Sequence, residues 1–129
     1  MKNLFVLTTI LLTLISCKKE IPGCTDYQAD NYSSEATYDD NTCQYSGDVL
    51  FYVTQPMNYV DVYFNGQHQV ISVYYNVSTP SCGASGCATF HAPTGTYNMT
   101  AQEQGIGGNS WAGPILVKKN QCVKFELTP

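Results

Sequence analysis

The sequence predicts an all-β fold: a small antiparallel β-sandwich of about seven strands in residues 46–129, preceded by a disulfide-closed acidic loop module in residues 23–45. Three observations support this expectation. Apolar and polar residues alternate with a period of two over short runs, as they do in strands with one buried face. Turn residues separate these runs about every 8 to 15 residues, and the Asn65-Gly66 pair is a strong hairpin signal. No run shows the period of a helix.

The alternating runs mark seven expected strands. They cover residues 49–54, 59–64, 69–75, 87–91, 96–101, 115–117 and 122–127. A loop rich in Gly, Ser and Pro, residues 78–86, and a Gly-rich loop, residues 105–109, separate the later strands. Strands this short, joined by turns and without intervening helices, are typical of a sandwich of two antiparallel sheets.

The N-terminal segment indicates export. Lys2 precedes an apolar run from Leu4 to Ile15, which only threonines interrupt. A run of about 12 residues is too short to cross a bilayer, which needs about 20. It has the length and the flanking residues of a secretory signal peptide.

The small residue Ser16 stands directly before Cys17, and this pair after an apolar run resembles the bacterial lipobox. The resemblance implies that residues 1–16 are removed, that the Cys17 thiol is acylated, and that residues 17–22 are a lipidated tether. We therefore expect the chain to be anchored to the outer membrane or cell surface of a bacterium. The alternative is an ordinary signal peptide that has a cysteine at this position by chance.

The charge of the mature chain restricts its partners. Without Lys2 the chain keeps five lysines and all ten acidic residues, a formal charge of −5, and it has no arginine. This composition argues against a nucleic acid partner, because such binding depends on basic residues that neutralise phosphates. Ten tyrosines suit half-exposed strands, or a surface that faces carbohydrate or protein.

The acidic loop module needs covalent closure. Residues 23–45 contain almost no aliphatic side chain, so burial alone cannot stabilise them. Cysteines in an exported chain predict disulfides. A bond between Cys24 and Cys43, at the two ends of the module, would contribute about 3 kcal/mol in the chain-entropy account.

Five acidic residues and no basic residue lie inside this loop. Such a charge density requires solvation, or a hard cation bound through oxygen atoms. The candidate ligands for a calcium ion are Asp26, Asp39, Asp40 and Asn41. The alternative is a solvated acidic turn in which Asp26 and Asp39 cap their own backbone.

Two segments carry motifs of known families. Residues 23–45 fit the pattern GCTDxxAxNYxxxATxDDxxCxY and resemble a short repeat of extracellular bacterial proteins. This resemblance implies an exported spacer or adhesion-associated module, with calcium as a stabilising ion. Residues 93–101 resemble the P-x-G-x-Y-x-x-x-A hairpin of PEGA-like and carboxypeptidase-regulatory-like sandwiches. That resemblance supports the fold more than any role, because such sandwiches have unrelated functions.

Three cysteines remain in the sandwich domain. We expect a disulfide between Cys82 and Cys122, with Cys82–Cys87 as the alternative, and one free thiol. Together with His91 these cysteines have the residue types of a zinc site. However, the Cys-x4-Cys-x3-His spacing matches no close structural zinc motif.

The sequence contains no recognisable catalytic motif: no Gly-x-Ser-x-Gly, His-Glu-x-x-His or phosphate loop. Trp111, in the expected loop of residues 105–113, would either stack on a sugar ring or plug one end of the sandwich. We therefore expect a non-enzymatic, lipid-anchored binding or display module, with a glycan or a surface protein as its partner. The alternative is an accessory module or enzyme of carbohydrate processing.

Overall fold

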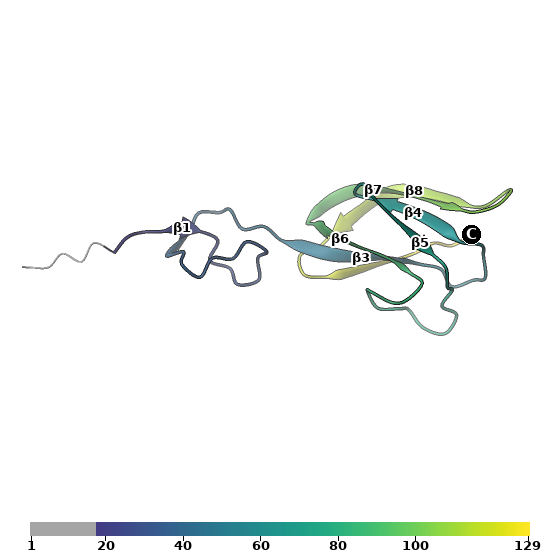
Figure 1. Ribbon diagram of the computed structural model, residues 1–129, viewed down its shortest axis with the longest axis horizontal. Coiled ribbons are helices and arrows are strands. Elements are labelled where there is room, and N and C mark those ends of the chain that lie inside the picture. The colour runs from purple at the N-terminus through teal and green to yellow at the C-terminus, as the bar shows by residue number, and fades with distance from the viewer. Residues whose placement is uncertain (1–17) are drawn as a thin grey trace, which may run out of the picture.

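The computed structural model describes residues 18–129, which form strands, turns and loops without any α-helix. The described chain is elongated, with the small acidic module at one end and the sandwich at the other (Figure 1). No helix within residues 18–129 is long and apolar enough to cross a membrane. The all-β class predicted from the sequence is confirmed.

The acidic module is held together by backbone hydrogen bonds of turns and short strands and by one disulfide. Strand β1 (Pro22–Gly23) pairs in parallel with β2 (Tyr38–Asp39). The disulfide between Cys24 and Cys43 closes the loop between its ends, as predicted. Cys24 is buried, and Ala29 is the only other buried hydrophobic residue of the module. The disulfide thus takes the place of an extended core.

Seven strands form the sandwich, which agrees with the predicted number. They are β3 (Ser46–Tyr52), β4 (Val60–Phe64), β5 (Gln67–Ile71), β6 (Ala88–Pro93), β7 (Gly95–Glu103), β8 (Ser110–Val117) and β9 (Cys122–Glu126). They build a three-stranded sheet in the order β6-β3-β9 and a four-stranded sheet in the order β5-β4-β7-β8. The edge strands of the two sheets are therefore β5, β6, β8 and β9.

One pairing differs from the antiparallel prediction. Four of the five strand pairs in the sandwich are antiparallel, but β9 pairs in parallel with β3, with Asp48 opposite Cys122. The reason is the connection that precedes β9. After β8 the chain passes through residues 118–121 from the four-stranded sheet to the three-stranded one, and it enters that sheet in the direction of β3.

The strand boundaries also shift from the predicted ones, and most of all in β5 and β8. The strand expected over 69–75 ends at Ile71, and residues 72–87 form a loop. The strand expected over 115–117 begins already at Ser110, because β7 and β8 pair continuously from Gly95–Val117 to Gln102–Ser110. Pro114 lies inside β8, which is tolerated because β8 is an edge strand.

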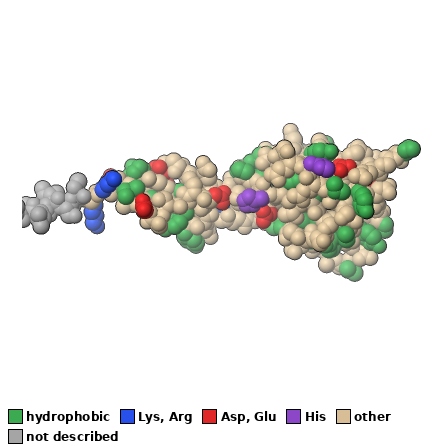
Figure 2. Space-filling model, in the orientation of Figure 1, with side chains coloured by type: hydrophobic (Ala, Val, Ile, Leu, Met, Phe, Trp, Pro, Cys, Tyr) green, Lys and Arg blue, Asp and Glu red, His purple; other side chains and the backbone are tan. Residues whose placement is uncertain are grey.

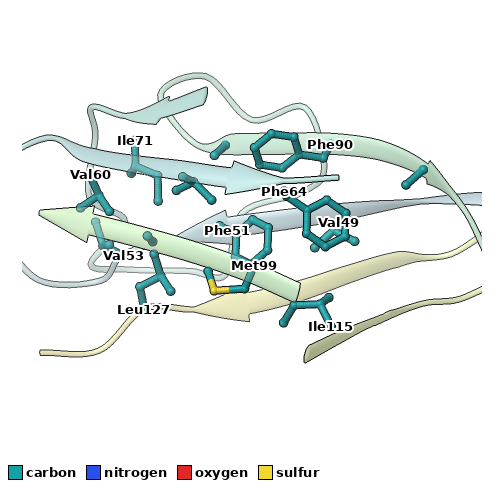
Figure 3. Close-up of a cluster of buried hydrophobic side chains, with 14 of the residues drawn as sticks. Val49, Phe51, Val53, Val60, Phe64, Ile71, Phe90, Met99, Ile115 and Leu127 are labelled. Carbon is teal, nitrogen blue, oxygen red and sulfur yellow. The ribbon is translucent and has the colours of Figure 1, made fainter. Parts of the chain in front are cut away.

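The core lies between the two sheets and is rich in phenylalanine. Phe51, Phe64 and Phe90 contact one another with ring centroids 5.6 to 5.9 Å apart (Figure 3). Inward-facing aliphatic residues of β4, β7 and β8 complete the cluster. Unlike the predicted alternation, β3 is buried on both faces, and a bridge between Val53 and Tyr74 attaches the loop 72–87 just beyond its end. This double burial makes β3 the most enclosed strand.

A polar junction fixes the acidic module to the turn between β8 and β9. The Lys119 Nζ atom donates to Asp26 Oδ2 at 2.8 Å, and it lies 3.8 Å from the centroid of the Tyr45 ring. The Tyr45 hydroxyl donates to the same carboxylate at 2.7 Å. Asn120 adds a bond to the carbonyl oxygen of Gln28. Side chains from both units therefore hold the module against the sandwich.

Candidate functional site

The cysteines of the sandwich form a structural bond. Cys82 and Cys122 are joined in a disulfide, as preferred from the sequence, and Cys87 is the free thiol within residues 18–129. Because two of the three thiols are used in this bond, the zinc interpretation is wrong. Burial raises the pKa of the Cys87 thiol, and a raised pKa lowers the fraction of reactive thiolate.

The acidic residues of the module hydrogen-bond mainly to their own backbone. Asp26 Oδ1 accepts from the amide of Gln28 at 2.9 Å, and Asp39 Oδ1 accepts from the amide of Asn41 at 2.8 Å. Asp40 accepts from both the amide and the hydroxyl of Thr42. The predicted caps at Asp26 and Asp39 are therefore present, and Asn41 has the positive φ of 62° that such a turn requires.

Residues 18–129 contain no group of three or more His, Cys, Asp or Glu side chains arranged to hold a metal ion. The carboxylate of Asp26 is also turned to the junction, where hydrogen bonds from Lys119, from Tyr45 and from the Gln28 amide lower its pKa to about 2. The side chains that the sequence suggested as calcium ligands thus do not gather into one donor set, which favours the alternative of a solvated acidic turn.

The outer face of the four-stranded sheet carries an exposed aromatic platform, defined here as Tyr63, His68 and Asp61. Half of the Tyr63 surface is exposed, and its ring stacks on the His68 ring with centroids 4.6 Å apart. Asp61 Oδ1 bonds to His68 Nε2 at 2.8 Å, and the other Asp61 oxygen accepts from Gln104 at 3.0 Å. Both bonds lower the pKa of the Asp61 carboxyl, and the bond from Gln104 has the larger effect. The Tyr63 ring is therefore held in one orientation.

A shallow hollow of about 330 Å³ lies beside this platform. Tyr63 forms one of its walls, and outward-facing side chains of β7 and β8 complete it: Thr100, Gln102, Ser110 and Ala112. The hollow lies below the Tyr63 ring because the side chains of Thr100, Ser110 and Ala112 are short. The Gln102 amide group is fixed at the rim by bonds to the carbonyl oxygens of residues 103, 108 and 109.

The sheet face around the hollow is almost free of charge. Asp61 is its only acidic residue, and no outward position of β4, β5, β7 or β8 is a lysine or arginine. On the side of the molecule drawn in Figure 2, blue side chains occur only near the N-terminal end of the described chain. This face can accept and donate hydrogen bonds, but it offers nothing to attract an anion.

Trp111 does not lie in a loop, as the sequence suggested, but inside β8. It is half-buried, packs against the core, and donates from its indole nitrogen to the Thr128 carbonyl oxygen at 2.7 Å. The continuous β7–β8 pairing explains the difference. Trp111 borders the hollow, yet its ring is anchored, so the plug interpretation fits better than the stacking one.

The aromatic platform was not predicted from the sequence, although the sequence contains a signal for it. A two-residue turn at Asn65-Gly66 fixes the register of the hairpin, so Tyr63 must stand opposite His68.

The two histidines of the chain bond to carboxylates, His68 to Asp61 and His91 to Asp48, and neither has a hydroxyl or thiol partner within residues 18–129. No nucleophile–base pair is visible there.

Comparison of the chain with known protein families, curated proteins and solved structures finds no match.

Proposed function

We propose that this protein is a lipid-anchored, exported binding module that holds an uncharged glycan against the outer face of its four-stranded sheet. The observation that carries the proposal is the exposed Tyr63 ring, held by His68 and Asp61 beside a shallow hollow lined by hydroxyl, amide and methyl groups. The ligand is bound and displayed rather than chemically changed.

The chemistry of the hollow suits a pyranose ring. One face of such a ring is made of C–H groups and packs on an aromatic plane, while its hydroxyl groups bond at the edges. Thr100, Ser110 and Gln102 supply such bonding groups around Tyr63. A face without basic residues does not favour anionic polysaccharides, because nothing compensates the desolvation of their carboxylates or sulfates.

The anchoring part of the proposal rests on Cys17, which lies outside the described residues. Residues 18–22 and the acidic module follow it and lead into β3. Acylation at Cys17 would place the sandwich beyond the module, away from the membrane surface. Two or three acyl chains give stable attachment where a single one is marginal.

Binding of neutral hexasaccharides to residues 18–129 tests the proposal. The panel holds cello-, xylo-, malto- and chitohexaose, with alginate as the anionic comparison, and calorimetry measures the affinity. We expect at least one neutral glycan to bind and alginate not to bind. Tyr63→Ala should weaken binding more than tenfold, since truncating a central aromatic residue of an interface costs about 2 kcal/mol or more.

Tyr59→Ala is the matched control. Tyr59 is as exposed as Tyr63 but lies just before β4, at another hollow lined by Met57 and Gly105. It should leave glycan affinity unchanged. Equal losses in both variants, or no binding by any glycan of the panel, would contradict the proposed site. Release of shortened sugars during the incubation would instead establish the carbohydrate-processing alternative.

A further inference from the structure

A second hollow, of about 400 Å³, opens on the opposite side of β8, at the edge of the sandwich between β8 and β9. Its lining is mainly apolar and comes from three strands: Met99 of β7, residues 110–115 of β8 and Phe125 of β9. We call it the edge hollow. Phe125 is 40 % exposed at its mouth and lies 6.0 Å from the ring of Phe51.

The edge hollow exists because one inward-facing side chain is missing. Buried and exposed positions alternate along β8, so Trp111, Gly113 and Ile115 point between the sheets. A Cβ atom added to Gly113 would meet no atom within 4 Å. The φ angle of Gly113 is not positive, so its backbone does not require a glycine. A side chain at this position would fit and would fill space that is now open.

Free strand edges border the hollow on both sides. β8 ends the four-stranded sheet and β9 ends the three-stranded one, and a free edge presents unpaired backbone N–H and C=O groups. Pro114 removes one donor from β8, whereas β9 (Cys122–Glu126) contains no proline. The edge of β9 is thus the better template for an added strand.

The positive charge of the sandwich is concentrated here. Residues 46–129 contain three basic side chains. Lys118 and Lys119 lie in the β8–β9 turn, and Lys124 lies in β9 itself. Lys119 is paired with Asp26, but neither Lys118 nor Lys124 forms an ion pair within the described chain. Lys118 precedes β9 and Lys124 is its central residue, so a segment with acidic residues would find basic partners near the start and the middle of this edge, before Glu126 at its end.

We propose that the edge hollow receives one apolar side chain of an extended, acidic peptide segment of another protein, which adds as a strand to the free edge of β9. In such strand addition the backbone bonds supply affinity, while pockets for alternate side chains supply specificity. The hollow takes the central apolar residue, and Lys118 and Lys124 attract acidic residues that flank it. The edge hollow shares Ser110, Trp111 and Ala112 with the glycan hollow, but Gly113 and Phe125 line only the edge hollow and Tyr63 lines only the glycan hollow.

The test uses residues 18–129 with both disulfides intact and a synthetic heptapeptide of alternating valine and threonine, with a central leucine and a glutamate at either end. We expect saturable binding by NMR, with the largest shifts at the Gly113 amide and the Trp111 indole N–H. Exchange of the β9 amides should slow. Gly113→Val, which fills the hollow, should weaken peptide binding at least tenfold. No binding, or undiminished binding by Gly113→Val, would overturn the proposal.

Thr100→Val is the matched control, because Thr100 points to the outer face and lines the glycan hollow but not the edge hollow. It should leave peptide affinity unchanged and weaken glycan binding, whereas Gly113→Val should do the reverse. Lys124→Glu should weaken binding of the acidic peptide and leave binding of a peptide with glutamine in place of each glutamate unchanged. If the apolar dye anilinonaphthalene sulfonate binds at Gly113 while the peptide does not, the hollow takes a small apolar ligand and the strand-addition proposal is wrong.

Discussion

Asp26 is the residue on which the position of the acidic module depends. It accepts hydrogen bonds from Lys119, Tyr45 and its own loop, and together they lower its pKa from 3.8 to about 2. A carboxyl group whose pKa is lower in the folded state stabilises that state above its unfolded pKa. This stabilisation is lost as the pH falls from about 4 to about 2.

We therefore expect the melting temperature of residues 18–129 to fall between pH 4 and pH 2, and Asp26→Asn to remove part of this fall. The variant should be less stable than the parent at pH 7 and equal to it near pH 2. Calorimetric melting across this range measures the difference. Asp30→Asn is the control, because the Asp30 carboxylate makes no hydrogen bond within the described chain. A parent and a variant that remain equally far apart at every pH would exclude an ionic role of Asp26.

The contacts of Asp26 also determine the effect that we expect calcium to have on stability. Asp26 is committed to Lys119, and Asp39 and Asp40 bond to amides of their own turn. Millimolar calcium should therefore raise the melting temperature of residues 18–129 no more than magnesium does, relative to chelator. A ligand that binds only the folded form would raise it by mass action. A calcium-selective rise that disappears in Asp39→Asn would show that these side chains rearrange around the ion.

Among the strands, β8 shows where the sequence is informative and where it is not. The run Ile115–Val117 alternates and was predicted as a strand, whereas Ser110–Pro114 contains the strand-breaking residues Gly113 and Pro114. Pairing with β7 overrides the local preference there. The parallel β3–β9 pair is likewise set by a crossover between sheets, which no local pattern records. The Tyr63–His68 pair was readable from its turn, but the edge hollow required knowing which strands lie at edges.

The loop between β5 and β6 depends on its disulfide. The Cys82–Cys122 bond closes 40 residues of chain and ties the loop to the first residue of β9. Replacing both cysteines with serine should lower the free energy of unfolding by about 3 to 4 kcal/mol in the chain-entropy account. Urea unfolding measures this. Cys87→Ser is the control and should change the stability little. A loss as large in the control would mean that Cys87 takes part in the bonding in solution.

At the scale of the whole molecule, the proposed lipid anchor would determine where the proposed binding surfaces act. Cys17→Ala should release the protein from the membrane fraction or leave it uncleaved, because the acylated thiol is the only attachment that we propose. Fractionation of cells that produce each form, followed by mass spectrometry of the N-terminus, measures this. A variant that remains with the membrane in mature form would contradict the lipobox interpretation.

The position of β3 has a mechanical consequence. The chain enters the sandwich from its N-terminal end through β3, which is hydrogen-bonded to β6 on one side and to β9 on the other. If the chain is anchored as we propose, a load pulled between a bound ligand and the membrane would act along the length of this strand. Sliding β3 out would require both ladders to shear at the same moment, whereas an edge strand would peel away one bond at a time. The central position of β3 would therefore help an anchored form to bear tension.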